Sequence, residues 1–553
     1  MSKVIVIGLD GATLDIIRPL AESGKLPNLS RLMDEGACGE LTSTLHPTTP
    51  QAWTTFMTGC GAGKHGIYDF IERIPDKYEV AFVNGSFKKV RSLWGLLSTY
   101  GKKVGVVNVP FTYPPEEVNG VMISGFDSPS VDTNFTYPEG LYDELVKEIG
   151  AYELRGTFPI GKKMSAYRVE HVEHVVNNRT DACTYLMNSR EWDLFVVVYG
   201  STDHVQHMFW RQMEEKAQGI VNEETEMFGN IIHDTYIMAD KAVGTLLENC
   251  GEDTIVMIMS DHGGGRLKRV VNLNNWLEKN GYLVYKKKPL KKYFVDGGKT
   301  VAKKYLPRTQ RDWIKSRFPG IKNRTESMSY FAEIDWLQTK AYSWGMYGNI
   351  SLNLKGRERD GLVSPEAYGE VCNEIKARLL KLEDPQSASM IVEKVHMKED
   401  IFTGNYTDRA PDILVQWKDY AYYTQGNLKR GDGDVFADKL YIDSSDFEHS
   451  GTHRLNGILL ANGPGVIRRG ATIEHATLAD ITPTILYAMG LPIPEEMDGN
   501  ILKEIFEDEF IKKNIPRKGE NAGPSGGNGE GVSSYSEEDK KQIWEKLKGL
   551  GYI

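Results

Sequence analysis

Short runs of apolar, largely β-branched residues recur along this chain and constrain its fold more than any other feature. They are bounded by Gly, Asp or Pro: VIVIG (4–8), VGVVNVP (104–110), LFVVVYG (194–200), TIVMIMSDHG (254–263), DILVQW (412–417) and GILLANGPG (457–465). Continuous apolar runs of this length are typical of strands that are buried on both faces. We therefore expect a mostly parallel central sheet that is covered by helices.

Helical patterns that end on glycine lie between these runs, as in residues 14–24, 92–101 and 480–490. Alternation of strand and helix predicts the α/β class. A chain of 553 residues is too long for one small core. We expect a first part of an α/β core at 1–265, a basic cap insertion at 266–340, the second part of the core at 341–508, a flexible linker at 509–534 and an amphipathic helix at 535–553.

Residues 286–324 form a basic block within the expected cap. The block holds fourteen Lys or Arg and two Asp, so it carries +12 while the rest of the chain carries −22. A solvated surface explains such a block. The alternatives are a cap over a polyanionic substrate, or a weak contact of residues 284–324 with an anionic membrane surface.

The overall composition argues against several classes of protein. The net charge of −10 disfavours a dedicated nucleic-acid-binding protein, because such proteins contact phosphates with an excess of Lys and Arg. Five cysteines without CxxC spacing fit reduced thiols better than disulfides. The first apolar run is too short for a signal peptide, and no run approaches the ~20 residues of a membrane helix. We therefore expect a cytoplasmic protein.

The expected C-terminal helix begins with a Ser-x-x-Asp capping pattern at Ser536 and carries one apolar face. That face consists of Ile543, Trp544, Leu547 and Leu550. It needs a partner surface, either on its own domain or on a second subunit, and the second case would make the helix a dimer contact.

Acidic residues and histidines lie where several predicted strands end or begin. They are Asp10 after the first run, Asp203, His204 and His207 after the third, Asp261 and His262 at the end of the fourth, and His449 and His453 before the last. Ligands of open α/β sheets bind at the carboxyl ends of the strands. A mixed set of carboxylates and imidazoles suits zinc or manganese.

The stretch HPTTPQAW (46–53) predicts the start of a helix, with Thr49 as the N-cap and Pro50 at the first helical position. If metals occupy the sheet edge, Thr49 is also a candidate nucleophile, because metal coordination and a helix N-terminus both stabilise an alkoxide. Two cations ~3.5–4 Å apart would then assist the attacking and leaving oxygens of a displacement at phosphorus.

Six motifs occur in a characteristic order: GLDGATLD, LPNLSRLMDEGA, PTTPQAWTTFMTGCGAGKHGIYDF, STDHVQH, MSDHGGG and GTHRLNGILLANGPG. Through these motifs the chain resembles the alkaline phosphatase superfamily, and most closely its type I phosphodiesterase/nucleotide pyrophosphatase family. The resemblance spans roughly residues 3–505. It implies an alkaline-phosphatase-like α/β fold with a cap insertion where the basic block lies.

The resemblance also implies a set of ligands. One metal would be held by Asp10, Asp261, His262 and the nucleophile Thr49, and a second by Asp203, His207 and His453. The preference for His207 over His204, for His453 over His449 and for Thr49 over Thr48 rests on the resemblance alone.

One position departs from the pattern of this family. Relatives usually place an asparagine three residues after the nucleophile, where it helps to hold a phosphoryl oxygen, whereas this chain has Ala52. A backbone amide at the helix start, Gln51, or a basic group such as Lys64 is the expected substitute for that contact. The substrate is therefore expected to differ from a standard nucleotide.

The resemblance implies a phosphohydrolase with two divalent metal ions, zinc or manganese, that cleaves a phosphodiester or pyrophosphate bond through a covalent phosphothreonine at Thr49. Its substrate would be a small phosphorylated molecule, such as a nucleotide, a lipid-linked phosphate or a sugar phosphate. One alternative is a metal-dependent phosphomutase or phosphotransferase of the same superfamily. Another is a non-catalytic, metal-bound sensor or scaffold.

Overall fold

The structure, a computed structural model, describes most of the chain: residues 2–154, 169–286, 331, 333–424, 433–438, 440–441, 448–463, 465–521, 523 and 535–549. The basic block therefore lies outside the described residues, apart from Lys286 at its start. Its role as a cap or a membrane-contacting surface stays a prediction. Helix α17 (Asp508–Lys513) and strand β26 (Lys518–Gly519) occupy part of the segment predicted as a linker.

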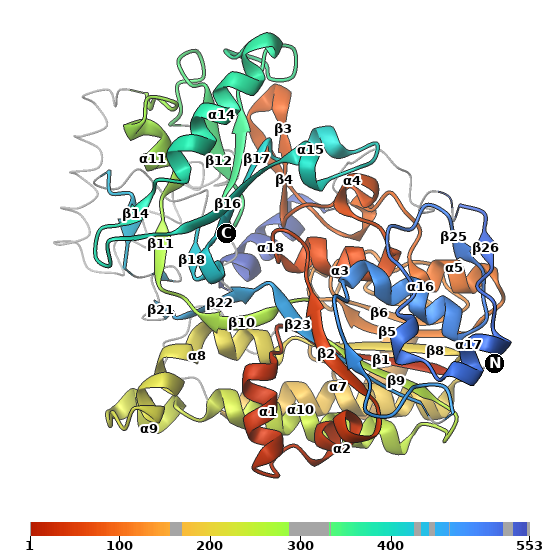
Figure 1. Cartoon of the computed structure of the whole chain (residues 1–553). Coiled ribbons are helices and arrows are strands. Elements are labelled where there is room, and N and C mark those ends of the chain that lie inside the picture. The colour runs from red at the N-terminus through yellow and green to blue at the C-terminus, as the bar shows by residue number, and fades with distance from the viewer. Residues whose placement is uncertain are drawn as a thin grey trace, which may run out of the picture.

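Within the described part of the chain, nine strands form the central sheet, in the order β24-β2-β23-β9-β1-β8-β5-β6-β7 (Figure 1). The five strands from β9 to β6 run parallel to one another. The bounds are β1 Val4–Leu9, β2 Ala37–Thr42, β5 Val104–Val109, β6 Gly120–Ser124, β7 Thr136–Tyr137, β8 Leu194–Tyr199, β9 Ile255–Met259, β23 Asn456–Asn462 and β24 Thr472–Ile473. The predicted α/β class with a mostly parallel sheet is confirmed.

Two of the six apolar runs do not form parallel strands of the central sheet. Strand β23 joins the central sheet but lies antiparallel to both β9 and β2. Strand β17 (Ile413–Trp417) belongs to a separate antiparallel sheet with β12 (Ala341–Trp344), β13 (Asn349–Leu352) and β16 (Val392–Met397). An apolar run indicates that a strand is buried, but it does not indicate the direction of the strand or the sheet to which it belongs.

Helices cover both faces of the central sheet (Figure 1). The residues of β1 alternate between the two cores that lie on these faces. Val4 and Val6 pack with α3 (Thr49–Thr58), α5 (Leu93–Thr99) and α16 (Leu478–Ala488). Ile5 and Ile7 pack with helices of the opposite face, namely α1 (Leu14–Glu22), α2 (Pro27–Glu35), α7 (Val169–Ser189), α8 (Ser201–Ala217) and α10 (Ile231–Glu248). Three of these helices, α1, α5 and α16, are those predicted at 14–24, 92–101 and 480–490.

The antiparallel sheet lies beyond the end of the central strands, next to the hairpin of β3 (Ile71–Ile74) and β4 (Glu79–Phe82) (Figure 1). Further elements are α4 Ala62–His65, α6 Leu141–Ile149, α9 Glu223–Phe228, α11 Leu273–Lys279, α14 Tyr368–Leu379, α15 Lys398–Ile401, β10 Gly263–Arg266, β11 Arg269–Val271, β18 Tyr422–Tyr423, β22 Gly451–Arg454 and β25 Ile493–Pro494.

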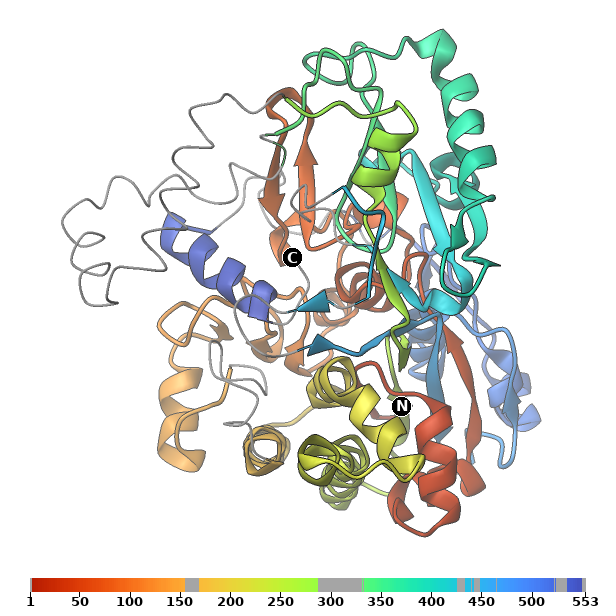
Figure 2. The same ribbon diagram turned by 90° about the vertical axis from the view of Figure 1, so that its left-hand side faces the viewer.

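The C-terminal helix α18 (Glu537–Gly549) docks on its own chain (Figure 2). Ile543 and Leu547 of its apolar face are 3% and 4% exposed, and the Trp544 ring lies 5.9 Å from that of Phe82. Leu550 lies outside the described residues. The partner surface that this face needs is therefore intramolecular, so the face gives no support to a dimer.

Among the helices that the structure describes, none is both long enough and apolar enough to cross a membrane.

Candidate metal centre and active site

The predicted ligands meet at the carboxyl end of the parallel strands. Asp10 directly follows β1, Asp203 lies in the first turn of α8 after β8, and Asp261 follows β9 by two residues. His453 comes from β22, which pairs with β10 so that His453 lies opposite Gly264. Parallel strands place their ends at one edge, and the β10–β22 hairpin adds a residue that is distant in sequence.

Helix α3 places Thr49 at this edge, although not as its cap. Thr48 has the extended backbone of an N-cap residue, and Thr49 is the first residue of the helix. The predicted N-cap is therefore wrong by one residue. The shift matters because the Thr49 side chain is not used to satisfy a backbone amide: its Oγ1 is buried and has no hydrogen-bond partner within the described part of the chain.

The first cluster consists of Asp10, Asp261 and His262, whose ligand atoms lie within 4.8 Å of one another. His262 Nε2 is 3.3 Å from Asp261 Oδ2 and 3.7 Å from Asp10 Oδ1. All three atoms are buried, and none forms a hydrogen bond with a described residue. Together with Thr49 Oγ1 they are the four ligand groups that the resemblance implies for one metal.

The second cluster consists of Asp203, His207 and His453. His207 Nε2 lies 2.9 Å from His453 Nε2 and 3.2 Å from Asp203 Oδ1, and His453 Nε2 lies 3.5 Å from the same oxygen. Asp203 and His207 are four residues apart on α8, so they share one face of the helix. The structure brings together the three groups predicted for the second metal.

Backbone groups orient the imidazole rings. The Nδ1 atoms of His207, His262 and His453 lie 3.2, 3.1 and 2.6 Å from the carbonyl oxygens of Gly451, Gly263 and Pro47, respectively. If each Nδ1 carries the proton, Nε2 is left as the lone-pair donor that faces the cluster. This arrangement is the one that metal-binding histidines commonly have.

Burial and neighbouring charges shift the pKa values of the three carboxylates in opposite directions. Burial and the nearby Asp203 raise the pKa of Asp10 to about 7, and burial and Asp10 raise the pKa of Asp261 well above its usual range. Burial opposes ionisation of Asp203 too, but the neighbouring histidines, His207 foremost, outweigh it and lower the pKa of Asp203 well below its usual range. Three carboxylates this close need added positive charge to stay ionised together.

The donor set therefore fits divalent cations. It combines oxygen and nitrogen atoms of Asp10, Asp261 and His262 that are buried without a hydrogen bond to any described residue, carboxylates that repel one another, and imidazoles oriented by backbone carbonyls. Zinc and manganese both accept such a mixed set.

A glycine allows the strand ends to approach each other closely. Gly11 has φ of +65°, and a Cβ atom there would lie 2.9 Å from Asp203 Oδ1. Its amide donates to Asp261 Oδ1 over 3.3 Å. A larger residue at this position would displace the carboxylate of the second cluster.

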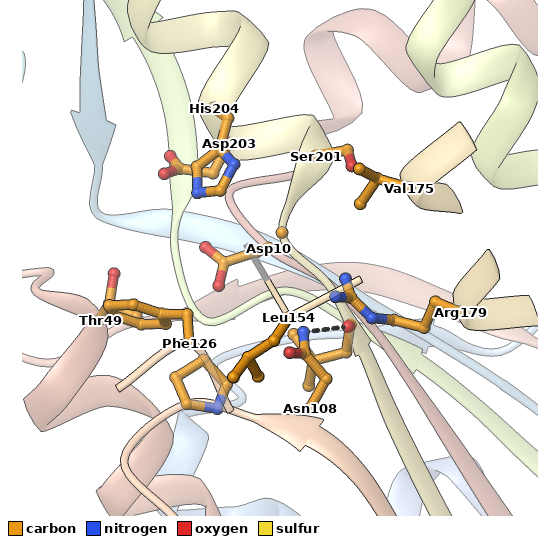
Figure 3. Close-up of a pocket in the computed structure, with 13 residues that line it drawn as sticks. Asp10, Thr49, Asn108, Phe126, Leu154, Val175, Arg179, Ser201, Asp203 and His204 are labelled. Carbon is orange, nitrogen blue, oxygen red and sulfur yellow. Dashed lines mark hydrogen bonds between the residues drawn. The ribbon is translucent and has the colours of Figure 1, made fainter. Parts of the chain in front are cut away.

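A pocket opens beside the clusters and is lined by Asp10, Thr49 and Asp203 (Figure 3). Its other wall includes Asn108 and Arg179, which sequence reasoning missed. Asn108 directly precedes the end of β5 and has φ of +57°, so the apolar run VGVVNVP held a detectable polar interruption. Arg179 lies within helix α7, where no pattern of spacing marks it.

The two predicted substrate contacts, Gln51 and Lys64, lie elsewhere. The Gln51 amide donates to the Leu45 carbonyl over 3.2 Å, and Lys64 pairs with Asp498. Neither residue lines the pocket that contains Thr49. His204 lines this pocket, whereas His449 stacks on His207 with ring centres 5.0 Å apart.

Comparison with solved structures places this fold among known enzymes. Phosphonoacetate hydrolase from Sinorhizobium meliloti 1021 matches with a TM-score of 0.54 and 15% identity, over 88% of this chain and 95% of that chain. Human ectonucleotide pyrophosphatase/phosphodiesterase 5 matches with a TM-score of 0.49 and 14% identity, over 92% of this chain and 100% of that chain. No curated protein sequence gives a match. The likeness to the Sinorhizobium meliloti enzyme shows a shared fold.

The family model for type I phosphodiesterase/nucleotide pyrophosphatase matches residues 4–453. The chain belongs to this family and is a phosphohydrolase of the phosphodiesterase/pyrophosphatase type. The matched range contains every predicted metal ligand, from Asp10 to His453.

Proposed function

We propose that this protein hydrolyses a phosphodiester or pyrophosphate bond of a small phosphorylated substrate through a covalent phosphothreonine at Thr49. The observation that carries the proposal is the Thr49 hydroxyl itself. It is buried at the first position of a helix, beside two clusters of ligands, and makes no hydrogen bond with the described residues. A structural threonine in such a place would normally satisfy its hydroxyl.

The described residues provide the nucleophile and the candidate metal ligands that this reaction needs. The Thr49 oxygen attacks phosphorus, and the bond from phosphorus to the leaving oxygen breaks. Water then attacks the same phosphorus, the bond to Thr49 breaks, and the hydroxyl is restored. The N-terminus of α3 favours negative charge on the Thr49 oxygen in both steps. Divalent cations held by Asp10, Asp261 and His262 and by Asp203, His207 and His453 would stabilise the attacking and leaving oxygens.

The identity of the cations and the location of the protein are parts of the same proposal. We expect zinc or manganese, because the donors are carboxylates and imidazoles. All five cysteines are free thiols, which supports a cytoplasmic location. Solved structures of the Sinorhizobium meliloti enzyme hold phosphonoformate or phosphonoacetate, and we propose a similarly small phosphorus compound as the substrate here.

The test is the substitution Thr49→Ala, assayed with a chromogenic phosphodiester and with the phosphomonoester of the same alcohol. We expect the rate of hydrolysis to fall by roughly three orders of magnitude or more, because the nucleophile is lost. Metal content, measured by mass spectrometry, should stay close to that of the wild type. Acid quenching of the wild type should trap a phosphoryl group on the peptide that contains Thr49.

The matched control is Thr54→Ala, because Thr54 is buried on the same helix and its hydroxyl donates to the Pro50 carbonyl. This variant should keep its activity. Undiminished hydrolysis by Thr49→Ala would overturn the proposed nucleophile.

A further inference from the structure

We propose that Arg179 binds a second anionic group of the substrate, a carboxylate or a phosphoryl group, across the pocket from Thr49. This inference rests on the proposed function, because it assigns a substrate contact in the same site. It narrows the substrate to molecules that carry a negative charge besides the phosphorus that is attacked.

Arg179 is a buried cation without an acidic partner among the residues that the structure describes. The residue is 4% exposed, and its Nε donates to the Tyr152 hydroxyl over 3.3 Å. Neither terminal nitrogen forms a hydrogen bond or ion pair with any residue that the structure describes. Residues 155–168, which follow Tyr152 and lie outside the described part, include no Asp or Glu in the sequence.

Among the described residues, the other buried arginine does have such a partner. Arg73, which is 6% exposed, pairs with Glu358. The guanidinium of the half-buried Arg357 likewise contacts Asp412 over 2.7 Å. Burial of an unpaired charge is costly, so proteins usually pair buried cations or use them to bind ligands. Arg179 fits a role in ligand binding, because the Tyr152 hydroxyl that it contacts is neutral and does not balance its charge.

The guanidinium group lies where a ligand of Thr49 would reach it. Arg179 extends from helix α7 into the pocket, on the side away from Thr49 (Figure 3). Asn108 is beside it, with Nδ2 donating to the Val198 carbonyl over 2.9 Å and Oδ1 buried without a hydrogen bond to a described residue. A phosphorus atom held at Thr49 would thus leave its further substituent facing Arg179.

The chemistry of the pocket favours an oxyanion at this position. A guanidinium presents parallel N–H donors that match the two oxygens of a carboxylate or a phosphoryl group. Phe126, Leu154 and Val175 line the same pocket, and such apolar walls strengthen electrostatic attraction because they exclude water. The carboxylates of Asp10 and Asp203 belong to the candidate metal clusters.

The experiment compares three 4-nitrophenyl phosphodiesters with the same leaving group, whose second alcohols are methanol, glycolate and hydroxymethylphosphonate. The first has no additional charge, the second adds a carboxylate and the third adds a phosphoryl group. For the wild type we expect kcat/KM to be roughly 10- to 100-fold higher for one charged ester than for the methyl ester. The better charged ester then tells which oxyanion the natural substrate carries.

Substitution of Arg179 should remove this preference. In Arg179→Gln, the ratio of kcat/KM for the charged ester to that for the methyl ester should fall by roughly 10- to 100-fold. Arg179→Lys keeps the charge but loses the paired donors, so it should lower the ratio less. The control is Arg190→Gln just after the same helix, whose guanidinium pairs with Glu144 on the surface, and its ratio should match the wild type.

The outcomes separate this inference from the proposed function. If the wild type hydrolyses none of the three esters, both fail. If it hydrolyses the methyl ester at least as well as both charged esters, the inference about Arg179 fails and the proposed function stands. The inference about Arg179 also fails, and the proposed function stands, if Arg179→Gln and Arg179→Lys both fold and keep the wild-type ratio of kcat/KM between the charged and the methyl ester.

Discussion

The indole N–H of Trp53 donates a hydrogen bond to Oδ2 of Asp10 over 3.0 Å. This bond links helix α3, which begins at Thr49, to the end of β1. It leaves Oδ1 of Asp10 as the oxygen that faces His262. The helix that carries the proposed nucleophile therefore also orients a predicted metal ligand.

We predict that Trp53→Phe weakens metal binding by about 10- to 100-fold, because groups that orient a ligand typically have effects of this size. The measurement is the amount of metal bound at equilibrium after treatment with a chelator and stepwise return of zinc or manganese. The control is Trp94→Phe, since Trp94 is equally buried and its indole donates to Glu116 over 3.0 Å, away from the clusters. Equal metal affinities in the two variants would contradict the role given to Trp53.

The docked C-terminal helix leads to a second prediction. Lys546 donates to the carbonyl oxygens of Phe126 and Ser128 over 2.7 and 3.0 Å, and Phe126 lines the pocket of Thr49. We expect Lys546→Met to speed hydrogen exchange of the α18 amides by roughly 10- to 100-fold, because charge-assisted bonds are lost. KM should rise as the Phe126 wall loosens.

The control for this prediction is Lys541→Met, at an exposed lysine of the same helix. Its exchange rates should follow the wild type. Unchanged exchange in Lys546→Met would mean that apolar contacts alone hold the helix.

The buried His65 predicts a loss of stability in acid. Burial lowers the pKa of His65 to about 3, from an ordinary value of 6.5. Between these values the unfolded chain takes up a proton that the folded chain does not, so stability falls as the pH drops below about 6.5. The unfolding free energy should lose up to about 2.5 kcal/mol between pH 7 and 4.5 through this group.

His65→Gln should reduce this loss, because glutamine does not titrate and can keep both hydrogen bonds of the ring. In the structure His65 Nε2 lies 3.1 Å from the Thr55 hydroxyl, and Nδ1 accepts from the Ile67 amide over 3.2 Å. Unfolding temperatures measured from pH 7 to 4.5 check the prediction against His475→Gln, at an exposed histidine. If the wild type, His65→Gln and His475→Gln lose stability in parallel as the pH falls, His65 does not cause the loss of stability in acid.

Much of the fold and the centre of the site could be predicted because they depend on local patterns. Apolar runs predicted the strands, and Asp10, Asp203 and Asp261 follow three of them, so the rule for parallel sheets put them at one edge. The same patterns could not predict the antiparallel direction of β23 or the separate sheet of β17, since burial is similar in both arrangements.

The amino-acid sequence by itself determined the α/β class, the family motifs and the chemical types of the ligands, because these depend on residue identity and short spacing. The family motifs already implied that His453 and Asp203 share a metal, and the tertiary structure brings their side chains within 3.5 Å of each other. Only the tertiary structure decided that the Thr49 hydroxyl has no partner among the described residues and that Arg179 lies in the pocket. Those relationships join segments that are distant along the chain, and they arise only when packing brings the segments into contact.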